Sequence, residues 1–598
     1  MTDKPRATTN VYTTLESEVR AAARKVAPNI PDDVIARIEV GPSRNLAMGE
    51  VSSNVALVAA RSAGMPTSSF ALAISEAINA LRLPTTAQPA ANNFVNFPRV
   101  DPSWWVEELH TILRAGEAYG DSKIGNGTRV NVEYVSANPT GPMHIGHCRG
   151  AVVGDALANL LTKAGYDVTK EYYINDAGAQ VTALAWATYW RYLQAIGTPL
   201  NEADFSEEVP GGLQYRGEYL IPIGERLAER YGTSLAQPDG DIAAPELWLE
   251  IVRNFTIEAM MQEIREDLHL LGVDHDLFSS ERANIASGAV DAAVDWLQSR
   301  GLIYEGVLDP PKGKAPDDWE PRPQTLFRAT QFGDDVDRPL RKSDGSNTYF
   351  ANDIAYHADK VNRGYDVLID VLGADHGGYV KRMSAAVQAL STNRDVKFEA
   401  VLCQMVRVVR GGEPVRMSKR AGSFVTLRDL LDEVGRDVVR FIMLTRKADA
   451  QMEFDLDQAV AQTRDNPVFY VQYAHARCRS VLRAAADMFG QVNLAAAQLD
   501  SLVAEAELAL IRRLAQWPRT VEAAAQAREP HRIAFFLYDL AGDFHMLWNR
   551  GKDDATLRFL QADRPAETLA RLALVAAAAV VIRSGLKVMG VEPVEEMR

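Results

Sequence analysis

Cysteine is scarce in this chain of 598 residues: only Cys148, Cys403 and Cys478 occur, and no two of them form a C-x-x-C pair. The sequence therefore predicts neither a disulfide framework nor a structural zinc site, and it favours a reducing compartment. No uninterrupted apolar run is long enough to span a membrane, and no apolar signal core follows Met1. We therefore expect a soluble cytoplasmic protein without membrane contact.

Positive charge is also in deficit, because Asp and Glu outnumber Lys and Arg and give a net charge of −15. This balance counts against a nonspecific nucleic-acid binder, but it allows a specific one whose basic residues gather on one face. The contents of 47% apolar and 24% charged residues are those of an ordinary globular protein. The length exceeds what a single core accommodates and predicts three or four domains.

Sequence patterns divide the chain into four regions. These are a small mixed domain at 1–120, an α/β domain at 121–460, an insertion within it at about 180–345, and a helical domain at 461–598. Helical periodicity from Val11 to Val26 and a strand-like run at 92–97, ended by Pro98, indicate the mixed domain. The insertion is longer than one crossover needs, and we expect helices in it together with a Pro-rich polar stretch at 309–323.

The α/β region has the element order of a nucleotide-binding fold. We expect a strand at 128–135, a turn at 138–142, a helix from about His144 to Ala164 and a strand at 166–174. This order is a βαβ unit. Further along, the patterns predict a strand at 365–372, a helix at 379–390 and one more strand at 398–409.

The motif His144-Ile145-Gly146-His147 stands at the start of the first of these helices. Its two imidazoles share one helical face, and Gly146 leaves room for a flat ring against the backbone. The helix N-terminus adds amide donors and the positive end of the helix dipole, which favour phosphate. By itself a His-x-x-His pair is more often an accidental surface pair or part of a metal site, but the Asn-Pro-Thr-Gly-Pro lead-in and the βαβ placement favour a nucleotide.

A second segment, Arg416-Met417-Ser418-Lys419-Arg420, follows the last predicted strand of the same fold. Its Ser and Gly neighbours indicate a loop from which Lys419 reaches the same phosphates as a compact point charge. We therefore predict that the two segments hold ATP from both ends.

These two motifs resemble the HIGH and KMSKS signatures of class I aminoacyl-tRNA synthetases, with Arg416 and Arg420 departing from the usual Lys and Ser. Longer segments, at 132–142, 172–178, 373–379 and 466–477, resemble the arginyl-tRNA synthetase family, and the likeness covers nearly the whole chain. It implies an α/β fold: a Rossmann-type class I catalytic domain with helical insertions. It also implies an N-terminal α+β domain at the tRNA elbow and a C-terminal all-helical anticodon-binding domain.

The reaction that the resemblance implies is arginine–tRNA ligation in two steps. The arginine carboxylate attacks the α-phosphate of ATP, and the ribose hydroxyl at the 3′ end of tRNA(Arg) then takes the arginyl group. Positioning and electrostatic stabilisation dominate such chemistry. ATP, L-arginine and tRNA(Arg) are the implied substrates, Mg²⁺ accompanies ATP, and adenylate formation is expected to need bound tRNA. We expect a monomer, because no coiled-coil seam is evident.

The resemblance also assigns site residues. Catalysis is assigned to His144, His147 and Lys419. ATP binding is assigned to His144, Gly146, His147, Asp375, His376, Met417, Ser418 and Lys419. Arginine binding is assigned to Glu133, Asn138, His144, Tyr349 and Asp353, because a guanidinium wants a carboxylate in fork geometry. Binding of tRNA is assigned to Phe94, Asn96, Gln472, Tyr473 and Arg477, and no residue is assigned to a metal.

Simpler roles remain open for three of these side chains. Asp353 alone reads as a surface acid of a helix, Asp375 as a helix N-cap, and Tyr473 as a core residue. Tyr349 lies four residues before Asp353 and shares its helical face.

Other functions are less consistent with the sequence. A cysteinyl-type synthetase calls for zinc-binding cysteines, and a glutamyl-type enzyme wants a cationic pocket rather than Glu133 and Asp353. A small nucleotidyltransferase has no need of the long helical C-terminal region. A tRNA-binding relative without activity is disfavoured, because His144, His147 and Lys419 are all present.

Overall fold

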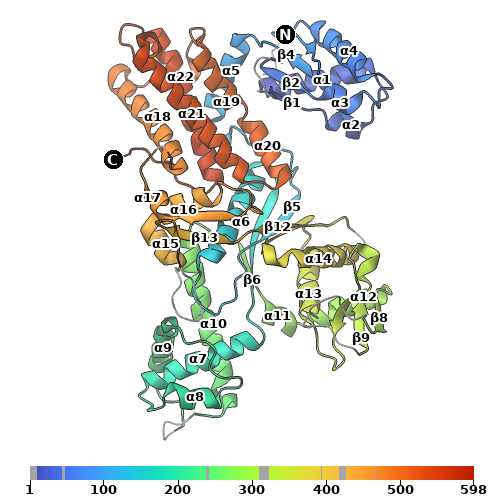
Figure 1. The fold of residues 1–598 in the computed structure, drawn as a ribbon, viewed down its shortest axis with the longest axis vertical. Helices are drawn as coiled ribbons and strands as arrows, with labels where there is room; N and C mark the ends of the chain where they lie inside the picture. The colour runs from blue at the N-terminus through green and yellow to red at the C-terminus, as the bar shows by residue number, and fades with distance from the viewer. Residues whose placement is uncertain are drawn as a thin grey trace.

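A five-stranded parallel sheet lies at the centre of the molecule, and the other domains extend from it (Figure 1). The computed structural model describes residues 10–43, 48–237, 242–308, 322–391, 394–415, 426–463 and 465–597. The sheet consists of β5 (Arg129–Glu133), β6 (Asp167–Ile174), β7 (Leu277–Ser280), β11 (Val367–Gly373) and β12 (Lys397–Cys403), in the order β12-β11-β5-β6-β7. Its central strands β5 and β11 are mostly buried, as expected for parallel strands covered on both faces.

The predicted βαβ unit is confirmed. Helix α6 (Ile145–Lys163) connects β5 to β6, with His144 as its N-cap and Ala164 as its C-cap. Helix α14 (Gly377–Leu390) connects β11 to β12 in the same way. From β5 the chain continues to β6 on one side, whereas β11 pairs with the other side of β5. The sheet order therefore reverses between β5 and β11, and ligands of such folds bind at the carboxyl ends of the strands at this switch point.

The single strand expected at 398–409 is wrong. The chain forms β12 and then β13 (Val406–Arg410), which leaves the central sheet and pairs with β14 (Glu413–Pro414) and β15 (Met452–Asp455). The buried guanidinium of Arg149 explains the break, because its Nη1 donates to the carbonyl of Gln404 at 2.9 Å and to that of Ala450 at 2.8 Å. A carbonyl that accepts from a side chain at this point is withdrawn from strand pairing.

The insertion forms two lobes rather than one, because β7 returns to the central sheet between them (Figure 1). The first lobe contains α7 (Ala179–Ala195), α8 (Glu202–Glu208), η3 (Glu218–Leu220), α9 (Ile221–Tyr231) and α10 (Pro245–Leu270). Its core is aromatic, with the rings of Tyr189 and Trp248 stacked at 3.7 Å.

The second lobe contains α11 (Glu281–Ala286), α12 (Ala289–Ser299), β8 (Ile303–Gly306), β9 (Gln324–Phe327), η4 (Ala329–Phe332), β10 (Arg338–Arg341) and α13 (Tyr349–Asn362). Most of the expected Pro-rich stretch, residues 309–321, lies outside the described residues.

The N-terminal domain contains α1 (Val11–Val26), α2 (Asp32–Ala36), β1 (Val40–Pro42), β2 (Val51–Ser53), α3 (Val55–Ala59), α4 (Thr67–Asn79), β3 (Gln88–Pro89) and β4 (Val95–Phe97). Its four strands form an antiparallel sheet, and the predicted helix at Val11–Val26 is confirmed. The next helices, α5 (Pro102–Ala115) and η2 (Gly116–Ala118), lie against the C-terminal helices α19 (Glu505–Ala515) and α22 (Pro565–Val588) rather than on this sheet (Figure 1).

The C-terminal region is helical, as predicted. It is preceded by α15 (Leu427–Val434), α16 (Arg436–Met443) and α17 (Leu456–Val460) at the end of the α/β region, and it contains α18 (Pro467–Phe489), η6 (Leu494–Ala496), α19 (Glu505–Ala515), α20 (Trp517–Ala527), α21 (His531–Asp553), η7 (Ala555–Leu557) and α22 (Pro565–Val588). Within the described ranges, α22 alone is long and apolar enough to cross a membrane, but 78% of its most apolar window is buried inside the protein. Its packing against α18, α21 and α5 is that of a core helix.

Candidate active site

A cavity of about 840 Å³ opens at the switch point between β5 and β11. The end of β5 supplies Glu133, β11 supplies Asp370, and α13 supplies Tyr349 and Asp353. The loop after β5 adds Asn138, whose amide donates to Gln180 at 2.9 Å. The structure therefore brings together four of the five residues predicted to bind arginine.

The floor of this cavity is acidic and is built around one buried cation. The ammonium of Lys360, which is fully buried, lies 2.5 Å from Glu133 Oε2 and 3.3 Å from Asp370 Oδ1. Burial raises the pKa of Glu133, and the Lys360 charge opposes that rise. Burial also acts on Asp370, but Lys360 and His357 outweigh it and lower the pKa of Asp370 to about 2. Two of the carboxylates thus already have a cationic partner within the protein.

Asp353 is the carboxylate of this floor that lacks a cationic side chain at ion-pair distance among the described residues. Burial raises its pKa to about 7, the neighbouring charge of Glu133 adds to the rise, and His357 opposes it. The ring of His357 is held by other groups: its Nδ1 lies 2.8 Å from the Asp353 carbonyl and its Nε2 lies 3.1 Å from Asp370 Oδ2. Both ring nitrogens therefore face oxygen atoms of the site, which fixes the orientation of the ring.

A second buried carboxylate, Glu171 on β6, holds α13 against the sheet. It accepts from Tyr356 at 2.9 Å and from both terminal nitrogens of Arg363 at 2.9 Å. Asn131 on β5 and Ser279 on β7 also donate to it, at 2.5 and 2.6 Å. Because these bonds join three strands to one helix, the side of α13 that carries Asp353 is held towards the cavity.

Tyr349 and Asp353 line the same cavity, although Tyr349 leaves 77% of its surface exposed at the rim. Nearby stand residues that were not predicted. Lys360 and His357 follow Asp353 at the spacing of one helical face, which is the signal that would have identified them. Three further lining residues carried no such signal, because only the fold brings them to the cavity: Asp370, Tyr379 and Arg382.

The histidine motif lies at the start of α6 and is absent from the described lining of this cavity. His144 Nδ1 accepts from the Gly146 amide at 3.1 Å, and His147 Nδ1 accepts from the His144 amide at 3.4 Å. The two rings lie 3.9 Å apart. A Cβ on Gly146 would meet the His144 ring at 2.8 Å, so the ring that needs this glycine is that of His144 itself.

The chain that follows the second signature segment lies beside the first from Thr426 onward. Arg416, Met417, Ser418, Lys419 and Arg420 lie outside the described residues. Thr426, shortly after them, forms an antiparallel bridge with His144, and the Leu427 amide donates to the Met143 carbonyl at 2.8 Å. The chain that leaves the Met-Ser-Lys segment therefore meets the histidine motif, as the prediction of one shared ATP site requires.

Asp375 and His376 lie in the short helix η5 (Ala374–His376), directly after β11. His376 lines the cavity, and both side chains are mainly exposed. The alternative role of Asp375 as a helix N-cap is wrong, because the N-cap of α14 is His376 and no described side chain caps that end.

A separate cavity of about 620 Å³ lies between α18 and α21 in the C-terminal region. Tyr473 and Arg477 line it together with Phe469, Tyr470 and His545. The Arg477 guanidinium stacks 4.0 Å above the Tyr473 ring and donates to its hydroxyl at 2.8 Å. Tyr473 is therefore a partly exposed residue of the cavity wall and not a core residue.

Gln472 lies apart from that cavity. It is buried, its Nε2 donates to the Glu592 carbonyl at 2.7 Å, and its Oε1 accepts from the Val594 amide at 2.8 Å. These bonds occupy the amide and fix the C-terminal segment, so the structure does not offer this side chain to RNA.

Phe94 and Asn96 line a cavity of about 570 Å³ in the N-terminal domain. Arg519 from α20 also lines this cavity. Asn96 is largely buried and donates to the Met48 carbonyl at 2.8 Å.

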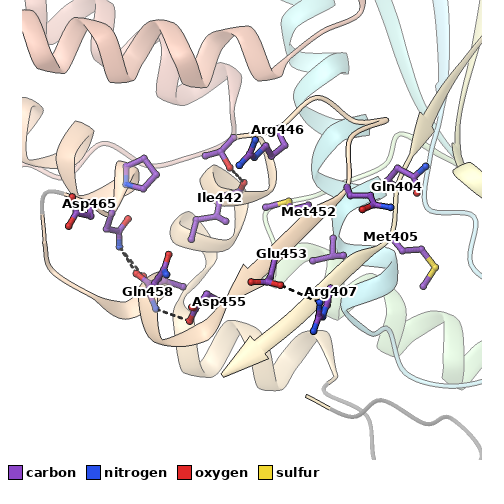
Figure 2. Close-up of a pocket in the computed structure, with 16 residues that line it drawn as sticks. Gln404, Met405, Arg407, Ile442, Arg446, Met452, Glu453, Asp455, Gln458 and Asp465 are labelled. Carbon is purple, nitrogen blue, oxygen red and sulfur yellow. Dashed lines mark hydrogen bonds and ion pairs between the residues drawn. The ribbon is translucent and has the colours of Figure 1, made fainter. Parts of the chain in front are cut away.

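Another cavity, of about 760 Å³, lies beside β13 and β15 (Figure 2). Its described lining contains none of the predicted site residues. On its wall, Arg407 Nη1 lies 3.7 Å from Glu453 Oε2.

Two models of known protein families match this chain. The model described as tRNA synthetases class I (R), catalytic domain, matches residues 108–196 and 322–478. The model described as DALR anticodon binding domain matches residues 471–597.

Relatives that match nearly the whole chain are arginine–tRNA ligases. The arginine–tRNA ligase of Gluconobacter oxydans is 61% identical over 586 residues and covers 97% of each chain. That of Rhodospirillum rubrum is 53% identical over 602 residues, covering 98% of this chain and 100% of its own. Among solved structures, Thermus thermophilus arginyl-tRNA synthetase matches with a TM-score of 0.74 at 21% identity, covering 98% of this chain and 100% of that chain. This last likeness supports the fold.

Proposed function

Because the chain belongs to the arginyl-tRNA synthetases, the class I arginine–tRNA ligases, we propose that the cavity between β5 and β11 is its L-arginine site. The activity is ATP-dependent ligation of arginine to tRNA(Arg). The observation that supports the site is the acidic floor, in which Asp353 alone of the described acids is left to meet a substrate cation. Glu133 and Asn138 complete the contacts at the end of β5, and Tyr349 closes the rim.

The positively charged guanidinium of arginine complements the one carboxylate of this floor that has no cationic partner, that of Asp353. Lys360 already compensates Glu133 and Asp370, so one bidentate carboxylate remains for one planar cation. A neutral isostere such as citrulline would leave the Asp353 carboxylate without a cationic partner, and this is the kind of mismatch that polar sites reject strongly. We assign His144 to the junction of the arginine and ATP sites, because it begins α6 next to this cavity's strand β5.

The ATP phosphates are proposed to lie at the N-terminus of α6. Amide donors and the helix dipole favour anions there, and His144 and His147 stand at that end. Gly146 is assigned to the same site, where it leaves room for the His144 ring, and His376 lines the cavity from the β11 side, with Asp375 beside it. The bridge between Thr426 and His144 supports a role for Met417, Ser418 and Lys419 at the same phosphates.

In the proposed first step the arginine carboxylate attacks the α-phosphate of ATP, and pyrophosphate leaves. In the second step the ribose hydroxyl of the tRNA attacks the adenylate carbonyl, and AMP leaves. His147 and Lys419 stabilise the negative charge on the phosphate in the first step. This step, formation of the adenylate, is expected to need bound tRNA. Within the described ranges no group of three His, Cys, Asp or Glu side chains is arranged for a metal ion, so Mg²⁺ is expected to enter with ATP.

The tRNA contacts are proposed at two cavities. Phe94 and Asn96 are assigned to the tRNA elbow, in an N-terminal domain at 1–120. Tyr473 and Arg477 are assigned to an anticodon base, in the helical domain at 461–598. The catalytic domain is proposed to span 121–460. We further propose a cytoplasmic monomer, and the three buried free cysteines fit a reducing compartment.

Arginine affinity is predicted to depend on pH through Asp353. Its pKa of about 7 means that the carboxylate is mostly protonated at pH 6 and mostly ionised at pH 8. Since only the ionised form pairs with a guanidinium, kcat/KM for arginine should rise about tenfold over this interval. Initial rates of charging at saturating ATP and tRNA measure this. Inhibition by neutral citrulline is the control and should not strengthen as pH rises. A flat or falling arginine profile would contradict the assignment.

Replacing Tyr473 by alanine is predicted to weaken tRNA binding. Loss of one stacked base costs about 1–3 kcal/mol, which corresponds to a loss of roughly 5- to 150-fold in affinity. Filter binding of full-length tRNA measures the dissociation constant. Gln472→Ala is the matched control on the same helix, because its amide is bonded to the C-terminal segment. Equal loss in both variants would point to damage of α18 rather than to a base contact.

A further inference from the structure

The chain bends sharply where β5 ends, and this bend carries backbone strain. Val135 and Ser136 have φ angles of 70° and 40°, in the left-handed region. Among the described residues they are the only two consecutive non-glycine residues with positive φ. A β-branched residue such as valine is a rare outlier there, and such strain persists only where the surrounding structure holds it. Both residues line the proposed arginine cavity.

Strand β6 and the residue that follows it hold this bend. Asn175 Nδ2 donates to the Ser136 carbonyl at 3.0 Å. The Tyr172 hydroxyl donates to the Ala137 carbonyl at 2.8 Å, and the Tyr173 amide donates to Ser136 Oγ at 3.0 Å. Regular pairing of parallel strands would give that amide a backbone carbonyl as its acceptor. The serine side chain therefore takes the place of a strand carbonyl where the backbone of β5 turns away.

The hydroxyl of Ser136 has a single proton, and that proton is directed at Glu133. Ser136 Oγ donates to Glu133 Oε1 at 3.0 Å, while Glu133 Oε2 pairs with Lys360. Each oxygen of this carboxylate thus has a fixed donor within the protein, and each keeps a lone pair for a substrate donor. Without the hydroxyl, Lys360 alone would hold the carboxylate. An ammonium is a point charge with rotatable donors, so it does not fix the plane of its partner.

We propose that Ser136 is a positioning residue for L-arginine, and that it acts by fixing the orientation of the Glu133 carboxylate in the cavity. The strained bend is what brings its hydroxyl back towards β5. Strand β6 then holds both acids of the cavity, because Glu171 holds α13 with Asp353, and the residues after Glu171 hold the bend after Glu133. The inference rests on the proposed arginine site, in which Glu133 is assigned as a substrate contact.

A cycle of two variants tests whether Ser136 acts through Glu133. Steady-state charging, with each substrate varied in turn, is measured for the native chain, Ser136→Ala, Glu133→Gln and the double variant. We expect Ser136→Ala to raise the arginine KM about tenfold, the effect of one hydrogen bond to a charged group, with kcat nearly unchanged. In the Glu133→Gln background the same substitution should raise this KM by no more than about threefold, because a neutral amide has replaced the carboxylate.

Ser136→Gly separates the hydroxyl from the strain. Glycine adopts a positive φ readily, so this variant should resist urea better than Ser136→Ala. Its arginine KM should nevertheless rise as much as that of Ser136→Ala, because both variants lack the hydroxyl. Ser280→Ala is the matched control. Its hydroxyl also donates to a carboxylate at this end of the sheet, that of Asp176 at 2.6 Å, but outside the described lining of the cavity. It should leave the arginine KM near the native value.

Three results would overturn the proposal. One is an unchanged arginine KM in Ser136→Ala. Another is an equal rise in the native and Glu133→Gln backgrounds, since the serine would then act independently of the carboxylate. The third is a native arginine KM in Ser136→Gly, which would assign the effect of Ser136→Ala to the conformation of the bend. Failure of the arginine site itself has a different signature, an unchanged arginine KM in Asp353→Asn.

Discussion

Asp353→Asn is expected to raise the KM for arginine by roughly 30- to 4,000-fold, because truncating one partner of a buried charge pair costs about 2–5 kcal/mol. Asparagine keeps the shape of the side chain but removes the charge that meets the guanidinium. Its amide hydrogens also point donors at a substrate group that has only donors. The KM values for ATP and tRNA should change little, because Asp353 lies on the floor of the arginine cavity. Steady-state charging with each substrate varied in turn separates these effects.

Asp359→Asn is the matched control for this variant. Asp359 lies on the same helix, is partly exposed, and pairs with Arg363 at 2.8 Å outside the described lining of the cavity. It should leave the arginine KM near the native value. In Asp353→Asn, discrimination between arginine and citrulline should also shrink, since the charge that favours arginine is gone. An arginine KM within twofold of native would refute the assignment of Asp353, and an equal rise in Asp359→Asn would show that α13 itself is disturbed.

Local patterns predicted the elements around the site well, because helix ends and strand alternation are encoded nearby in the sequence. The helix from His144 was predicted to within a residue, since an imidazole N-cap begins it and Gly165 follows it. Asp353 and Tyr349 were placed on one helix for the same reason. Glu133 and Asp353 were identified mainly through the family resemblance, because a single carboxylate on a strand or helix gives no local indication of its partner.

Long-range contacts account for what could not be predicted. The break between β12 and β13 depends on Arg149, which reaches Gln404 across 255 positions of the chain. The insertion is divided into two lobes because β7 pairs with β6. The sequence did not predict this division, because a strand of four residues gives little periodicity to detect. Lys360 was missed because a lysine near the end of a helix usually favours solvent or the helix dipole. Only the fold shows that it lies between Glu133 and Asp370.

Lys360→Met is expected to destabilise the protein by about 3–5 kcal/mol, because it removes the cation from a buried ion cluster and strands its partners. Glu133 would then lose its ion-pair partner on the cavity floor, and Asp370 would keep only His357. Asp370 shows the sign of the effect. In the native protein its pKa is lowered to about 2, so it adds stability that is present above its unfolded pKa and is lost as pH falls towards 2. Without Lys360 only His357 opposes the effect of burial, so the pKa of Asp370 rises and this stability is lost; the deficit of the variant should shrink as pH falls and the buried carboxylates are protonated.

Urea titration of the full chain at pH 7.5 and pH 5 measures this change, and a double variant separates charge from packing. In Glu133→Gln/Lys360→Met one stranded carboxylate is removed, so part of the lost stability should return. Lys381→Met is the control, because its pair with Asp335 is exposed and contributes little. If the single and double variants were equally unstable, the effect would be loss of packing rather than loss of charge. The arginine pocket would then not depend on Lys360 to leave Asp353 as its one uncompensated acid.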